Sequence, residues 1–169
     1  MTYTSAEAAK LLRKLNAEYD ALLLKEGKSR EFLASVGEDV ESVRPAYDYA
    51  ATQEKLGELE AKIRRLKHAI NVFNATTVIP SFGMTIDEML VYIPQLTKKK
   101  AKLAAMSEML PKSRAEEPYG RQSSVIDYRY ANYDIDAVTA DLAAVSDELA
   151  SAQLALDAVN HQASFEIDL

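Results

Sequence analysis

The chain contains no cysteine and no tryptophan, and its 169 residues include only five glycines and five prolines. Without cysteine it can form no disulfide, no thiolate metal site and no cysteine nucleophile. The scarcity of glycine and proline favours long regular elements over a loop-rich fold. No apolar run approaches the roughly 18 residues of a transmembrane helix, and residues 1–14 lack the apolar core of a signal peptide. We therefore expect a soluble, cytoplasmic protein.

Basic residues are missing from the C-terminal part of the chain. Residues 134–169 hold eight acidic side chains and no lysine or arginine, whereas the remainder carries all 20 basic residues and 18 acids. The whole chain has a net charge of −6. This separation predicts either charge complementarity between the C-terminal segment and the body, or an acidic face in contact with water.

Side chains that could perform catalysis or hold a cofactor are also scarce. The two histidines, His68 and His161, have no acid at a spacing that would complete a metal site. The glycines are scattered, so there is no phosphate-binding loop, and no serine has a histidine at motif spacing. We expect no enzymatic activity, no catalytic residue, no cofactor, no metal and no small-molecule substrate.

Four stretches instead show apolar residues alternating at spacings of three and four, which is the heptad pattern of packed helices. The two most regular seams are Leu56, Leu59, Ile63, Leu66, Ile70 and Phe73, and Val138, Leu142, Val145, Leu149, Ala152, Leu156 and Val159. Thr4 and Thr85 begin capping boxes, and Pro94 predicts a kink. We expect helices at about 5–26, 49–74, 85–110 and 135–160.

The connections after the first and third helices are about 20 residues long, and in an up-down-up-down bundle they fall at the same end. Segments 30–47 and 125–131 read as extended, residues 112–124 as a mobile loop and residues 164–169 as a short terminal strand. We predict a mainly α fold: an antiparallel four-helix coiled-coil bundle with a small β-hairpin or sheet formed by the two long connections at one end. Residues 1–169 would form a single elongated domain. An extended hairpin completed by a second chain is the alternative.

Tyrosine gathers in or beside these two connections, and tyrosine is enriched at protein interfaces. The possible partner surface consists of Tyr47, Tyr49, Tyr119, Tyr128, Tyr130 and Tyr133. The alternative is that these rings form a small private core that fastens the sheet to the bundle.

Two basic stretches, residues 98–102 and 62–67, could form a nucleic-acid stripe. The isoelectric point near 5.0 and the acidic fourth helix argue instead for a face that is solvated or paired within the chain. Surface ion pairs of this kind contribute about 0–1 kcal/mol each.

A pattern over residues 63–160 resembles the septicolysin-like family of bacterial helical proteins. The residues that carry it are Ile70-Asn71, Asn74, Thr85-Ile86-Asp87-Glu88-Met89-Leu90, Leu96, Leu103, Ile126, Asn132-Tyr133-Asp134, Glu148-Leu149, Gln153, Leu156 and Asn160. The resemblance implies a helical architecture, and the family name implies a pore-forming toxin. The connection at 28–47 and the Ile93-Pro94 kink depart from the pattern.

The leading hypothesis is a non-enzymatic helical interaction or assembly protein that self-associates along residual seam surface. A membrane-active, toxin-like protein is the second hypothesis, suggested by the family name, and liposome leakage tests it. A nucleic-acid binder acting through the basic helix faces is the third, and salt-dependent retention on DNA or RNA tests it. The partner, the oligomeric state and the biological process stay open.

Overall fold

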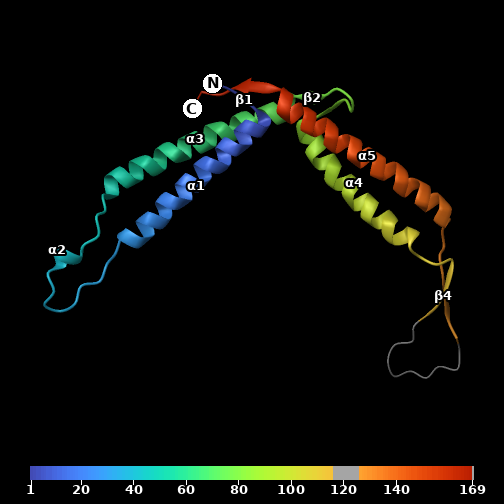
Figure 1. The fold of residues 1–169 in the computed structure, drawn as a ribbon, viewed down its shortest axis with the longest axis horizontal. Coiled ribbons are helices and arrows are strands. Elements are labelled where there is room, and N and C mark those ends of the chain that lie inside the picture. Colours follow the sequence, from blue (N-terminus) through green and yellow to red (C-terminus); the bar gives the residue numbers. More distant parts are fainter. Residues whose placement is uncertain (116–125, 169) are drawn as a thin grey trace. The chain divides into compact units, whose positions relative to one another are not determined.

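A computed structural model describes residues 1–115 and 126–168 of the chain. The fold is mainly helical with small antiparallel sheets, as expected (Figure 1). The helices are α1 (Ser5–Ser29), α2 (Val40–Val43), α3 (Tyr49–Thr76), α4 (Ile86–Ser107) and α5 (Ile135–Gln162). The strands are β1 (Thr2–Thr4), β2 (Val78–Ile79), β3 (Met84–Thr85), β4 (Lys112–Arg114), β5 (Tyr128–Tyr130) and β6 (Ser164–Glu166).

The chain divides into two compact units, each built on a helical hairpin. The first unit comprises Met1–Thr77 with Ala158–Leu169, and the second comprises Val78–Asp157. In the first unit α1 and α3 lie side by side and antiparallel (Figure 1). The buried core of this unit consists of Ala8 and Leu15 on α1, Leu66 on α3 and Ile167 near the C-terminus. Half-buried Leu59, Ile63 and Ile70 pack against it. The predicted seam of the 49–74 helix is therefore confirmed.

In the second unit α4 and α5 form the corresponding antiparallel hairpin. The Tyr92 hydroxyl on α4 donates to the Glu148 carboxylate on α5, and the Tyr133 hydroxyl donates to the Met106 carbonyl at 2.9 Å. The buried seam residues are Ile86, Met89, Leu96 and Leu103 on α4, and Val138, Val145, Leu149, Ala152 and Leu156 on α5. Helix α4 continues through Pro94 and ends at Ser107, before the expected end at residue 110.

Side-chain caps fix where the long helices begin. Thr4 and Thr85 each form the predicted capping box, with Glu7 and Glu88 reaching back to the cap. The Asp48 carboxylate accepts from the Ala51 amide, and the Asp134 carboxylate accepts from two amides of α5. These bonds satisfy N–H groups that a helix leaves without an internal partner.

The three sheets differ from the expected single sheet between the two long connections. Strand β5 pairs with β4 inside the same connection, β2 pairs with β3, and β1 pairs with β6. The expected sheet between the two long connections is therefore wrong. Pairing within one connection closes a shorter loop, which costs less chain entropy than joining two distant segments. Strand β4 falls within the stretch 112–124 that was expected to be a loop, and residues 116–125 lie outside the described residues.

The connection at 30–47, expected to be a hairpin, contains no strand. It turns at Gly37, whose φ of 88° suits a residue without a side chain, and then forms the single turn of α2. The Ser35 amide donates to the Glu38 carboxylate, and Asp39 caps α2. Short polar side chains that bond to nearby backbone compete with a β ladder, which explains the difference.

The two hairpins repeat one pattern along the chain. A strand leads into a Thr capping box and a first helix, a tip follows, and a Tyr-Asp pair begins a second helix of 28 residues that ends in a strand. The equivalent positions are Thr4 and Thr85, Ala8 and Met89, Leu15 and Leu96, Tyr47 and Tyr133, and Asp48 and Asp134. The first strand of each repeat pairs with the last strand of the other, since β1 pairs with β6 and β3 with β2.

Candidate functional site

The structure describes five of the six predicted partner tyrosines and divides them between the two units. Tyr47 and Tyr49 belong to the first unit, whereas Tyr128, Tyr130 and Tyr133 belong to the second, and Tyr119 lies outside the described residues. Tyr47 and Tyr133 are half-buried, and each bonds through its hydroxyl to the first helix of its own hairpin. Each of these two tyrosines therefore ties its connection to the first helix of its own hairpin by one hydrogen bond, and the partner surface stays a prediction.

Tyr128 and Tyr130 share one face of the ribbon formed by β4 and β5. They are 48% and 61% exposed. In the ladder Lys112 lies opposite Tyr130 and Arg114 lies opposite Tyr128, so two cations and two rings alternate on that face. The Lys112 Nζ lies 4.1 Å from the centre of the Tyr128 ring and 5.5 Å from that of Tyr130.

The two cations of this ribbon face were not predicted, because a Lys-Ser-Arg sequence carries no apolar alternation. The sequence does contain one indication of it. Lys112 and Arg114 are two residues apart, as are Tyr128 and Tyr130, and residues at this spacing lie on the same face of a strand. A cationic and aromatic face suits an anionic or π-rich partner.

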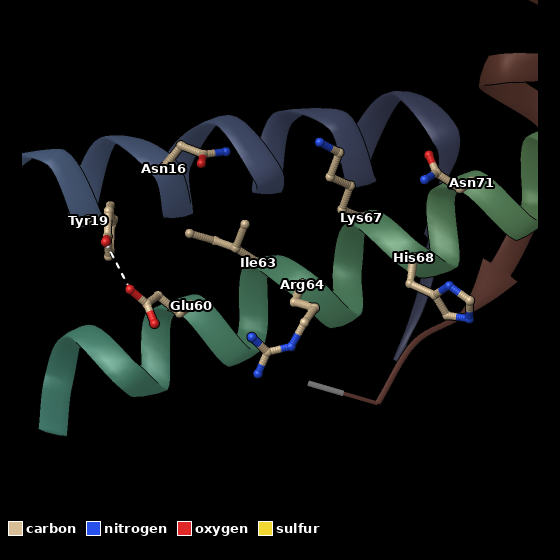
Figure 2. A pocket seen from close by; sticks show the side chains of 8 residues that line it. All are labelled: Asn16, Tyr19, Glu60, Ile63, Arg64, Lys67, His68 and Asn71. Atoms are coloured by element: carbon tan, nitrogen blue, oxygen red, sulfur yellow. Dashed lines mark hydrogen bonds between the residues drawn. The ribbon is translucent and has the colours of Figure 1, made fainter.

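A second candidate site is a polar groove along α1 and α3, with a volume of about 540 Å³. Its lining consists of Asn16, Tyr19, Glu60, Ile63, Arg64, Lys67, His68 and Asn71. Figure 2 shows Tyr19 and Glu60 bonded at one end, His68 and Asn71 at the other, and Ile63 between the two helices. We call this surface the α1–α3 groove.

The α1–α3 groove is positive overall. Its carboxylate, Glu60, accepts a hydrogen bond of 2.9 Å from the Tyr19 hydroxyl, and this bond raises the pKa of the Tyr19 phenol. Neither Arg64 nor Lys67 lies within 4.0 Å of a carboxylate in the described ranges. The groove therefore presents cations that can receive an acidic partner.

The lysines of α4 were expected to be either solvated or paired within the chain, with the acids of α5 as the available partners. Within residues 1–115 and 126–168, no lysine at positions 98–102 comes within 4.0 Å of a carboxylate. These lysines of α4 can therefore meet an anionic group of an external partner.

Two further searches bear on the excluded site types. In the described part of the chain, no three histidine or acidic side chains are placed so that they could hold a metal ion. No helix there has the length and apolar character that spanning a bilayer demands.

No protein-family model matches the chain, and no curated protein matches it. The fold is similar to the crystal structure of a functionally unknown conserved protein from Corynebacterium diphtheriae. The match covers 98% of this chain and 100% of that one, with a TM-score of 0.63 and 19% sequence identity. At this identity the likeness shows the fold alone.

Proposed function

We propose that this protein is a non-enzymatic interaction module that assembles with further copies of itself through its helical hairpins. The observation that carries the proposal is the set of large apolar side chains left in solvent along the helices. These are Leu23, Leu24 and Val72 in the first hairpin, and Leu90, Val91 and Leu154 in the second.

Two antiparallel helices can bury only the stripe along which they meet. Each hairpin therefore leaves most of its helical surface open, and further helices are needed to cover the apolar part. A four-helix coiled-coil arrangement, completed by hairpins coming together, would do so. The contacts between hairpins would use these exposed apolar side chains, beside the seams that are already buried within each hairpin.

Solution mass tests this proposal. Light scattering coupled to size-exclusion chromatography, over a hundredfold range of concentration, should give a mass that rises above 18.7 kDa. Small-angle scattering on the same samples would show whether the assembly is a compact bundle. A constant monomeric mass across the range would contradict the proposed assembly.

Nucleic-acid binding is a second candidate, favoured by the lysines of α4, which pair with no carboxylate of the described residues, together with the exposed ribbon face of β4 and β5. Exposed tyrosines provide stacking surfaces for bases, and nearby lysines and arginines meet phosphates. A labelled single strand of mixed sequence should then be retarded at low salt and released as salt rises. No retardation at low salt would remove this candidate.

We also propose that the chain is a bacterial, cytoplasmic member of the septicolysin-like family. The residue pattern over 63–160 supports membership, and the bacterial origin follows from the family that this pattern resembles. Cell fractionation tests the compartment, and leakage from liposomes tests the pore-forming activity that the family name implies.

A further inference from the structure

Helix α5 exposes both acids and apolar residues on the side away from its buried seam. Asp136, Asp147 and Leu154 are separated by 11 and seven residues, so they project from the same side of the helix. Leu154 is 71% exposed. Three exposed alanines (Ala140, Ala143 and Ala150) share this side, where they would let another helix approach closely. A helix with apolar residues on opposite sides is normally covered on both.

The α1–α3 groove offers the complementary charges. The chain gives α5 no lysine or arginine, whereas the groove carries Arg64 and Lys67 beside the half-buried floor residue Ile63. From Glu60 to Asn71 the groove follows twelve residues of α3, or about 16 Å of helix. A docked helix could therefore lie along the groove for about three turns.

The repeat relates the two surfaces to each other. His68 and Leu154 are equivalent positions of α3 and α5, and Arg64 is equivalent to Ala150. Equivalent faces of the two hairpins therefore differ in character: one is cationic, and the other is apolar and flanked by acids. Two copies of the chain can bring these different faces together.

Charge also selects the direction of docking. If Leu154 lies over Ile63, then Asp147 lies about 10 Å further along the groove. In an antiparallel arrangement that point falls between Lys67 and Asn71, where the groove is positive. In a parallel arrangement it falls on the other side of Glu60, where the carboxylate repels an aspartate.

From these observations we infer that the α1–α3 groove binds the outward face of α5 of a second copy of this chain, antiparallel to α3. Leu154 of one copy fills the groove beside Ile63 of the other, and Asp147 pairs with Lys67. The inference rests on the proposed self-association and names the surfaces that carry it.

Charge reversal with rescue tests the contact. Lys67→Glu and Asp147→Lys should each weaken self-association by about tenfold or more, because each places like charges together. The double variant, with both reversals, should recover affinity to within about threefold of the unmodified chain. Lys98→Glu and Asp141→Lys are the matched controls, since they reverse exposed charges outside the two surfaces. Sedimentation gives the dissociation constants, and circular dichroism confirms that every variant folds.

The absence of cysteine allows a direct test of geometry. Asn71→Cys in one preparation and Asp147→Cys in another should form a mixed disulfide when the two are combined under mild oxidation. Lys98→Cys combined with Asp147→Cys should form far less. A disulfide requires Cα atoms within about 7 Å, so a product reports contact between two chains at these positions.

The outcomes separate the two proposals. A chain that is monomeric at every concentration contradicts the proposed self-association itself. An oligomer that is insensitive to Lys67→Glu and Leu154→Ala, or that gives no mixed disulfide, overturns only the inferred contact. If the single reversals lower the stability of a monomer and the double variant restores it, the groove and α5 meet within one chain. That result also overturns the contact between copies.

Discussion

The two hairpins differ in how they hold the connection between their helices. In the first hairpin side chains hold it, whereas in the second it forms a backbone ladder of two strands. At the end of α1, the Glu26 carboxylate accepts hydrogen bonds of 2.7 Å from both the Tyr47 hydroxyl and the Gln53 amide. At the end of α4, strands β4 and β5 form a ribbon, and the Tyr133 hydroxyl donates to the Met106 carbonyl. The same Tyr-Asp pair thus begins the second helix of each hairpin, but its tyrosine is anchored to a charged group in one and to a neutral group in the other.

This difference shows which parts of the repeat must be alike and which can vary. The helix starts and the seams must be alike, because both hairpins depend on them to bury an apolar stripe. The tips only have to reverse the chain, so each can use its own chemistry. One consequence is that the free end of the first hairpin depends on ionisation in a way that the second does not.

Equivalent core leucines provide the strongest comparison. Leu15→Ala in α1 and Leu96→Ala in α4 should each lower the free energy of unfolding by about 2–4 kcal/mol, because both side chains are buried at matching seam positions. Chemical denaturation measures the loss, and hydrogen exchange locates it in one hairpin or the other. Losses that differ by more than about 2 kcal/mol would show that the two seams are not equivalent.

The caps should give a smaller and equally matched effect. Thr4→Ala and Thr85→Ala should each cost about 1 kcal/mol, since each removes a side-chain acceptor from the start of a long helix. Thr→Ser at the same positions keeps the acceptor and is the control. Thermal unfolding of the four variants measures the effect, and a loss confined to one hairpin would break the parallel.

Acid should act on both caps in the same direction. The backbone amides of Thr4 and Thr85 donate to Glu7 and Glu88, and these bonds lower the pKa of both carboxyl groups. A lowered pKa in the folded state means that the stabilisation is present above the ordinary glutamate range and is lost as the pH falls through the lowered pKa. Glu88→Gln should remove the acid dependence of the second hairpin while leaving that of the first.

The helices were predictable because packing and capping leave periodic traces. The seam from Leu56 to Phe73 and the capping box at Thr85 could be read from spacing alone. The repeat was also present in the sequence, since Tyr47-Asp48 and Tyr133-Asp134 both precede second-helix seams. No single interval reveals it, because equivalent residues of the first helices are 81 positions apart and those of the second helices are 86 apart.

The ribbon and the α1–α3 groove were not predictable in the same way. Strand β4 exposes two of its three residues, so no apolar alternation marks it. The groove side chains flank the seam of α3, where charged residues are ordinary on any exposed helix. Only the packing of α1 against α3 shows that Asn16 and Tyr19 lie across from Arg64 and Lys67.

Alkaline titration distinguishes the two tyrosine anchors. The hydrogen bond to the Glu26 carboxylate, followed by burial, raises the pKa of Tyr47 from 10.0 to about 12. Because the folded-state pKa is raised, the stabilisation is complete below about pH 10 and is lost as the pH rises towards 12. Tyr47→Phe should remove this loss, which thermal unfolding across that range would detect. Tyr133→Phe, which leaves the Met106 carbonyl without its donor, should cost about 1 kcal/mol even at neutral pH.

The smallest expected effect concerns the ribbon face. Lys112→Gln removes the cation over the Tyr128 and Tyr130 rings, a contact that contributes about 0.5–1 kcal/mol at an exposed site. The ladder should then open about two- to fivefold more often. Hydrogen exchange at the Ala115 and Ala131 amides, which bond across the ribbon at 2.9 and 3.1 Å, measures this opening.

The matched change in the first hairpin is Arg44→Gln, because the Arg44 guanidinium lies 5.2 Å from the centre of the Phe32 ring. Arg44 also pairs with Glu41 at 2.8 Å, so its removal takes away two contacts instead of one. It should nevertheless leave exchange at Ala115 and Ala131 unchanged if the tips are independent. Faster exchange at those two amides in the Arg44 variant would mean that the ends of the two hairpins are coupled, and that each tip does more than reverse its own chain.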